Sequence, residues 1–135
     1  MREPLRRALK PYLALACVAA LLPAVACGRA RKGHDYTVRA MVVQPPDPST
    51  GLYIYHEAID NWVGHDGKVE GMDPMAMPFP VAQGVSLSGL QANDKVEVTL
   101  HADWEADTPV QITSVRKLSP DTKLEFRAAK PPQNP

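Results

Sequence analysis

The stretch Lys95-Val-Glu-Val-Thr-Leu-His-Ala102 decides the fold class, because apolar and polar side chains alternate along it residue by residue. Successive side chains of a β-strand point to opposite faces, so this alternation predicts a strand with one buried and one solvated face. Four further strand-like runs share its short length and its bounding turn residues. They span residues 36–44, 51–56, 75–82 and 110–118. Five short strands without a convincing long helix predict an all-β domain, a small closed or nearly closed barrel.

The strand expected over residues 75–82 contains Pro78 and Pro80. Neither proline can donate a ladder hydrogen bond, so this strand should lie at an edge of the sheet or be bulged. Between the second and third strands lies a polar insert, residues 58–71, in which Asp66-Gly67 between Val63 and Val69 predicts a hairpin turn.

The chain has 135 residues, enough for one small domain. Its formal net charge of zero hides an asymmetry, because the first 26 residues hold four basic side chains and one acidic one. Their removal leaves 11 basic and 14 acidic residues, a charge of −3. A nucleic-acid-binding protein is expected to be basic, so nucleic acid is not an expected partner.

The N-terminus carries an export signal. A basic segment, residues 1–10, precedes an apolar segment, residues 11–26, that is too short for a confident membrane span. The sequence Ala24-Val25-Ala26-Cys27 resembles a bacterial lipobox. We therefore predict a signal peptide over residues 1–26 and a lipid on Cys27 that anchors the protein on the periplasmic side of the envelope. Ordinary cleavage that leaves Cys27 as a free thiol and an uncleaved anchor remain alternatives, and each of them also exports the domain.

The remaining chain divides by composition into three parts. Residues 27–35 form a polar tether, residues 36–118 form the β domain, and residues 119–135 contain four prolines with mixed charge. The last segment is expected to be mostly disordered.

A cluster of methionines supplies the candidate chemistry. In Met72-Asp-Pro-Met75-Ala-Met77-Pro-Phe79, the pair Met75 and Met77 would share one face of a strand, about 7 Å apart. With the imidazole of His56 from a neighbouring strand they would form a soft, uncharged donor set, which favours Cu(I)-type ions. Considered alone, this spacing favours a buried strand face, because methionine fills cores well and a lone histidine is more often structural.

The export signal changes that balance. Once Cys27 carries lipid, the folded domain has no cysteine, so it holds neither a disulfide nor the thiolate that a blue-copper site needs. Methionine cannot oxidise to a disulfide in an oxidising compartment, so a copper site built from Met and His is chemically sensible there. In the insert, Trp62 would either cover a bound cation with its ring or anchor the loop, and His65 would be an extra ligand or a solvated side chain.

Residues 36–118 resemble the periplasmic copper/silver-binding CusF-like domain. The resemblance rests on the opening strand Tyr36-Thr-Val-Arg-Ala-Met-Val-Val, on His56-Glu-Ala-Ile59 and on Met75-Ala-Met-Pro-Phe79, followed by residues 90–94. It implies a five-stranded OB-type β-barrel that binds one Cu(I) or Ag(I) through His56, Met75 and Met77. The best-known members have a tryptophan at the position of Met72, which would here be a third thioether donor or an apolar cap. Trp62, from the longer loop, would then regain the covering role.

These features predict an exported, monomeric Cu(I) or Ag(I) metallochaperone or buffer for copper efflux and tolerance, which passes the ion to an exporter. Delivery to a cuproenzyme such as a respiratory oxidase would use the same site. A third hypothesis is an OB-type module that binds an oligosaccharide or a protein and merely buries its methionines. The sequence contains no Ser/His/Asp or Cys/His constellation and no phosphate loop, so an enzyme is not expected.

Overall fold

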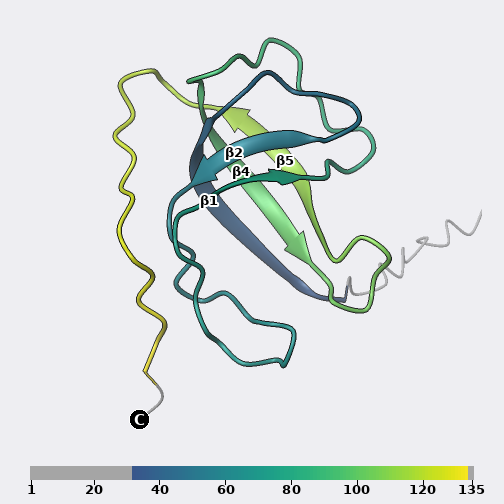
Figure 1. The fold of residues 1–135 in the computed structure, drawn as a ribbon, viewed down its shortest axis with the longest axis vertical. Coiled ribbons are helices and arrows are strands. Elements are labelled where there is room, and N and C mark those ends of the chain that lie inside the picture. The colour runs from purple at the N-terminus through teal and green to yellow at the C-terminus, as the bar shows by residue number, and fades with distance from the viewer. Residues whose placement is uncertain (1–31, 134–135) are drawn as a thin grey trace, which may run out of the picture. The chain divides into compact units, whose positions relative to one another are not determined.

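The structure, a computed structural model, describes residues 32–133, so the predictions for residues 1–26 and for Cys27 lie outside the described residues. Within this range no helical stretch has the length and hydropathy of a membrane span. The five strands are β1 (His34–Val42), β2 (Leu52–His56), β3 (Ala76–Phe79), β4 (Lys95–Ala102) and β5 (Val110–Lys117) (Figure 1). Each lies where the sequence predicts a strand, and the all-β class is confirmed.

The strands form one sheet in the order β3-β2-β1-β4-β5, with every neighbouring pair antiparallel. The edges of this sheet approach each other just beyond β3, where Val81 pairs in parallel with Ile112 of β5. Two backbone hydrogen bonds support this contact: Ala82 N–H donates to the Ile112 carbonyl and Ile112 N–H to the Pro80 carbonyl, each at 2.8 Å. The sheet therefore curls into an incompletely closed barrel, and β3 is an edge strand as its prolines predict.

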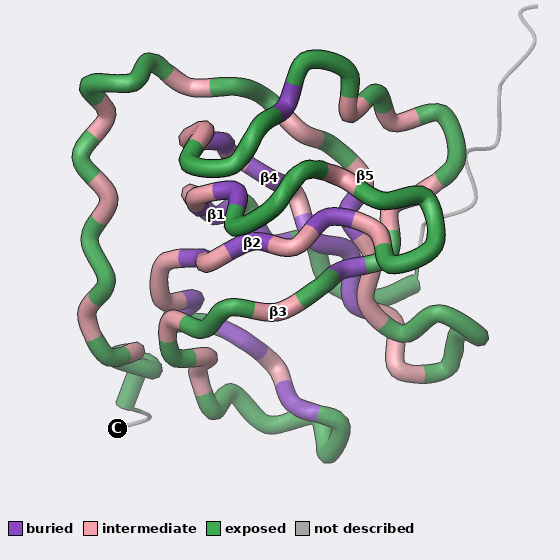
Figure 2. The backbone as a smooth tube through the Cα atoms, turned by 45° about the horizontal axis from the view of Figure 1, so that its top comes forward, coloured by how far each residue is buried: buried purple, intermediate pink, exposed green. Residues whose placement is uncertain are grey.

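The core follows the strand alternation. Along β4 the side chains of Val96, Val98 and Leu100 are fully buried, and the residues between them are partly exposed (Figure 2). The inward faces of the other strands complete the same core, with Tyr36, Val38, Ala40, Val42, Leu52, Ile54, Phe79 and Ile112. Buried apolar area of this kind stabilises the domain by about 25 cal/mol per Å².

The insert continues the register between β2 and β3. Tyr55 pairs with Ala76 in the ladder, and Ile59 then pairs with Met72, through N–H···O bonds of 2.9 Å in both directions. The tip is the predicted hairpin, in which Val63 pairs with Val69 and Gly67 adopts a φ of +79° that suits glycine. The insert thus holds the chain before β3 against the chain after β2.

The segment after β5 is the one that composition predicts to be mostly disordered. Residues 119–131 run along the barrel toward the end of β2, the yellow segment at the left of Figure 1. The Arg127 guanidinium donates to both carboxylate oxygens of Asp60, at 2.8 and 2.7 Å, and it holds the pKa of Asp60 far below the usual range. Composition predicts disorder because the segment lacks a core of its own, whereas here the barrel supplies the acceptors.

A glycine at the end of the turn before β2 allows β3 to lie close to it. Gly51 has a φ of +82°, and a Cβ built on it would collide with the backbone carbonyl of Phe79. Gly84 has a similar φ of +87° but nothing lies within 4 Å of its Cβ position. An alanine at either position would therefore be strained by the left-handed backbone, but only at position 51 would its Cβ also collide with β3.

We expect Gly84→Ala to lower the free energy of unfolding by about 1–2 kcal/mol, the cost of a left-handed alanine. Gly51→Ala should lower it by at least twice as much, because β3 must also move away from β2. Urea unfolding of both variants measures the difference. Equal losses would mean that the contact between Gly51 and β3 relaxes at no cost.

Candidate metal site

His56 ends β2 on its inward face, with Leu52 and Ile54, and its side chain is 0% exposed. Its Nδ1 lies 2.7 Å from the Glu57 carbonyl oxygen. Because a carbonyl can only accept, Nδ1 carries the proton and donates, which leaves the lone pair on Nε2. Among residues 32–133, Nε2 of His56 is the single buried side-chain nitrogen or oxygen without a hydrogen-bond partner. Such an atom ordinarily costs about 1–3 kcal/mol, so it calls for an explanation.

Burial also sets the protonation state of this imidazole. Desolvation lowers the pKa of His56 below its usual value, and the hydrogen bond to the Glu57 carbonyl offsets part of that effect. The ring is therefore neutral at pH 7, with the Nε2 lone pair free to bind a metal ion. A neutral imidazole whose other nitrogen is tied to a carbonyl has the arrangement of a metal-ligating histidine.

The β2–β3 register brings the two predicted methionines to the same face. Ile54 pairs with Met77 and Tyr55 with Ala76, so the next position sets His56 opposite Met75, and His56 N–H donates to the Met75 carbonyl at 3.3 Å. Side chains at directly opposite positions have Cβ atoms about 4.5–5.5 Å apart, and diagonal neighbours are about 7–8 Å apart. His56, Met75 and Met77 therefore lie side by side.

Exposure rises in steps across this group. His56 is fully buried, Met77 is half-buried and packs against the core, and Met75 is 42% exposed. The three candidate donors thus range from a fully buried imidazole on β2 to an exposed thioether just before the edge strand β3. An ion bound there would have a donor at the surface through which it could enter and leave.

Met72 lies three residues before Met75 in the same segment. Its partner Ile59 is buried, and Met72 itself packs against the core, so this pair faces the interior. Met72 and Met75 are joined by the short segment Asp73-Pro74. The sulfur of Met72 is thus a candidate fourth donor or an apolar cover for the site.

The two candidates of the insert lie elsewhere. Trp62 is buried, with its ring centroid 4.7 Å from that of Tyr36 and 6.0 Å from that of Trp104. Tyr36 is four residues, about 13 Å, along β1 from Ala40, the partner of His56. His65 contacts Trp104, beyond the far end of β4. The structure therefore holds Trp62 as part of the core and keeps His65 away from the three candidate donors.

Arg39, which sequence reasoning did not single out, contacts Glu57, the residue that follows His56. Arg39 of β1 donates from Nε and Nη2 to the two carboxylate oxygens of Glu57, both at 2.9 Å, and Glu57 N–H donates to the Arg39 carbonyl. These bonds hold the backbone and side chain of Glu57, the residue whose carbonyl accepts the hydrogen bond from Nδ1 of His56. Arg39 and Glu57 are 18 positions apart, so only the pairing of β1 with β2 reveals the contact.

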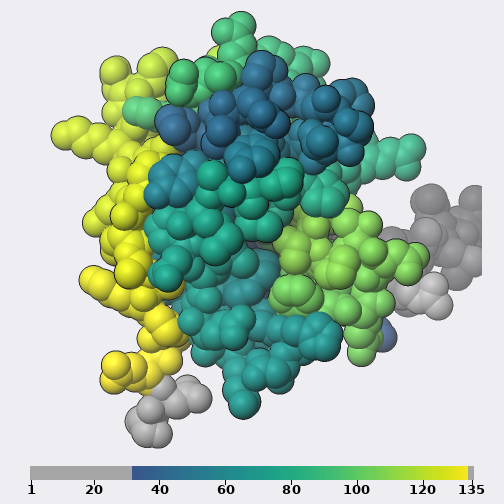
Figure 3. Space-filling model, in the orientation of Figure 1, coloured from purple at the N-terminus to yellow at the C-terminus, as the bar shows by residue number. Residues whose placement is uncertain are grey.

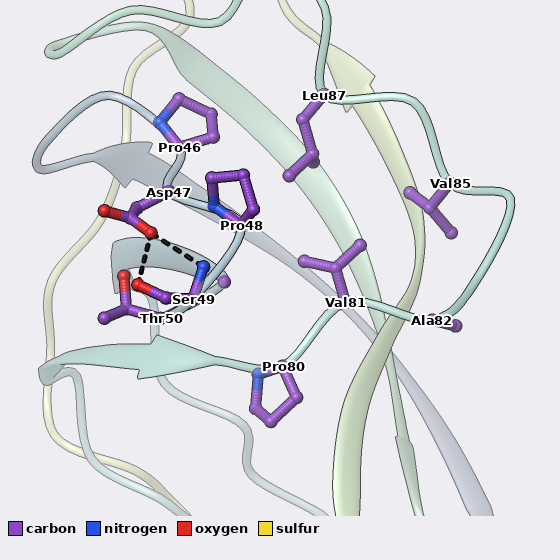
Figure 4. Close-up of a pocket in the computed structure, with 11 residues that line it drawn as sticks. Pro46, Asp47, Pro48, Ser49, Thr50, Pro80, Val81, Ala82, Val85 and Leu87 are labelled. Carbon is purple, nitrogen blue, oxygen red and sulfur yellow. Dashed lines mark hydrogen bonds between the residues drawn. The ribbon is translucent and has the colours of Figure 1, made fainter.

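One groove of the domain lies away from these donors. It has a volume of about 510 Å³ and lies at the opposite end of β2, between the turn before β2 and the loop after β3 (Figure 4). Its walls are mainly proline and aliphatic side chains, and its one carboxylate, Asp47, accepts hydrogen bonds from Ser49. It offers neither sulfur nor imidazole.

The donor set fits a soft monovalent ion. No group of three or more His, Cys, Asp or Glu side chains is placed to hold a metal among residues 32–133. Within the described range, the one imidazole with a buried, unpaired nitrogen lies instead beside thioethers, which suit Cu(I) and are poor ligands for hard cations.

Comparison with known proteins agrees with this chemistry. The sequence model of one family, described as copper binding periplasmic protein CusF, matches residues 35–117, which include all five strands except the first residue of β1. No curated protein and no solved structure matches the chain.

The unpaired Nε2 leads to a prediction about the metal-free protein. We expect His56→Leu to lower the free energy of unfolding by less than about 1 kcal/mol, or to raise it. Leucine loses the Nδ1 hydrogen bond, worth about 0.5–1.5 kcal/mol, but removes the unsatisfied nitrogen, which costs about 1–3 kcal/mol. Urea unfolding without metal measures the change.

Ile54→Ala is the matched control, because Ile54 is equally buried and two positions away on the same face. It should lose about 2–5 kcal/mol. A comparable loss for His56→Leu would show that the imidazole is retained for packing.

Proposed function

The chain belongs to the CusF family of copper-binding periplasmic proteins, and from this premise we propose that it carries Cu(I) in the cell envelope as a metallochaperone or buffer for copper efflux. His56, Met75 and Met77 are the proposed ligands, and Met72 is the fourth donor or cover. The observation that carries the proposal is the buried, unpaired Nε2 of His56 in a strand register opposite Met75.

Transfer would proceed by ligand exchange. Met75 is the most exposed proposed donor, so it would be the first to release the ion and the first to receive it. His56 would remain in place, because its tautomer and orientation are held by the Glu57 carbonyl. The ion is cargo in this mechanism, and neither binding nor release requires a change in oxidation state.

Substitution of the methionines tests the ligand set. Met75→Leu/Met77→Leu should weaken Cu(I) binding roughly 100-fold or more, because two soft donors are lost. Its metal-free stability should change by less than about 1.5 kcal/mol, because leucine conserves the volume of methionine. Competition with a chromophoric Cu(I) chelator measures the affinity of residues 28–135, and urea unfolding measures the stability.

Met41→Leu is the control, because Met41 lies on β1 opposite Tyr55 and Lys95 and outside the proposed site. It should bind one equivalent as tightly as the parent protein. If the double variant bound Cu(I) as tightly as the parent protein, the methionines would not be ligands. Met72→Leu then separates the two roles of Met72, since loss of a donor weakens binding and exchange of an apolar cover does not.

We further propose that a lipid on Cys27 holds the protein at the membrane. The intact mass of the protein purified from the membrane fraction should exceed that of the unmodified chain from residue 27 by a diacylglyceryl group on the Cys27 sulfur and an acyl chain on its α-amino group. Cys27→Ser should release the protein into the soluble periplasmic fraction, and Cys17→Ser should change nothing. A soluble parent protein with an unmodified Cys27 would favour ordinary cleavage.

A further inference from the structure

The segment after β5 contacts both parts of the chain that carry the proposed ligands. We use the name strap for residues 119–131. In Figure 3 the strap, in yellow, packs against the residues of β2 and of the chain that leads to β3, in teal. The family match ends at residue 117, so the strap lies outside the matched residues.

One set of contacts reaches the strand that ends in His56. Phe126 stacks on Tyr55, with ring centroids 4.2 Å apart and an interplanar angle of 20°. The backbone N–H of Glu125 donates to the side-chain carboxylate of Glu57. The backbone carbonyl of the same Glu57 accepts the hydrogen bond from Nδ1 of His56. Tyr55 and Glu57 are the two neighbours of His56 in sequence, so the strap contacts both residues that flank this ligand.

A second set reaches the segment that leads to the methionines. Ala129 N–H donates to Oδ1 of Asp73 at 2.8 Å, and Asp73 lies between Met72 and Met75. A Cβ on Gly71 would lie 3.0 Å from the Ala129 side chain, so the strap packs closely there.

Asp60 joins the two sets. It accepts the forked pair of hydrogen bonds from Arg127 and a backbone N–H from Lys130 at 2.7 Å. A bidentate pair between Arg and a carboxylate fixes orientation as well as distance. Arg127 thus sets the position of the strap between its contact with Tyr55 and its contact with Asp73.

These contacts matter because β3 is held on one side by β2 and is short. Its methionine end lies at the edge of the sheet, where Met75 is 42% exposed. We propose that the strap positions Met75 and Met72 relative to His56 from the outer face of the sheet, so that it raises the affinity for Cu(I) and slows release of the ion. Arg127 is a positioning residue in this arrangement. The inference rests on the proposed function and adds a control of affinity by the C-terminal segment.

The first test measures release from the protein as exported and purified from cells. Phe126→Ala/Arg127→Ala should release Cu(I) to an excess of chelator about three- to tenfold faster than the parent protein. Phe126→Ala/Arg127→Lys should release it more slowly than this double alanine variant, because lysine keeps the positive charge beside Asp60 but not the forked pair of bonds. Arg116→Ala is the control, because Arg116 forms a similar pair with Glu97 at 2.8 Å on β5 and β4, away from the strap. It should release the ion at the parent rate.

The second test uses the reciprocity of coupled sites. If the strap favours the metal-bound arrangement, Cu(I) must favour the docked strap by the same factor. Loading with Cu(I) should therefore slow hydrogen exchange at the amides of Ala129 and Lys130 in the parent protein and leave it unchanged in Met75→Leu/Met77→Leu. A strap that only stabilises the fold would not respond to the ion.

The outcomes separate the two proposals. A parent protein that binds no Cu(I) overturns the proposed function and the strap proposal with it. Tight binding by the parent, combined with parent-like release by the strap variants and unchanged exchange at Ala129 and Lys130, overturns the strap proposal alone.

Discussion

The register between β2 and β3 is the constraint on which the candidate site depends. It continues without a shift from the pair Leu52 and Phe79 through Tyr55 and Ala76 to the bridge of Ile59 and Met72. His56 and Met75 occupy opposite positions within it. A slip of one residue would turn each side chain of a strand to the other face, so the register that buries Leu52, Ile54 and Phe79 also brings imidazole and thioether together.

The buried imidazole shows how core and site share one face. Leu52 and Ile54 contribute to stability through burial, and His56 is equally buried but leaves Nε2 without a partner. An unsatisfied buried polar atom destabilises the metal-free fold. Its presence here is consistent with a role in binding a metal ion. The Arg39–Glu57 pair holds the side chain of the residue whose carbonyl determines which ring nitrogen carries the proton.

The edge strand and the strap are complementary. Pro78 prevents β3 from donating a ladder hydrogen bond at that position, which suits an edge and leaves the methionine end accessible. Edge strands with few hydrogen bonds move more readily than central ones. Contacts from Phe126, Arg127 and Ala129 add to the backbone hydrogen bonds that hold this end of β2 and the chain before β3 together.

The sequence by itself determined the all-β class, the five strands and the edge position of β3, because alternation and proline act on a strand locally. It also singled out His56, Met75 and Met77 as candidates, although it left a buried strand face open as an alternative. Only the tertiary structure decided that these three are neighbours, that Nε2 of His56 has no partner, and that Trp62 and His65 lie near Trp104 instead. It also docked the Pro-rich segment that composition predicts to be disordered. These features depend on pairing between segments distant in the chain, whose free energy comes from the assembled barrel and leaves no trace in the local pattern of either segment.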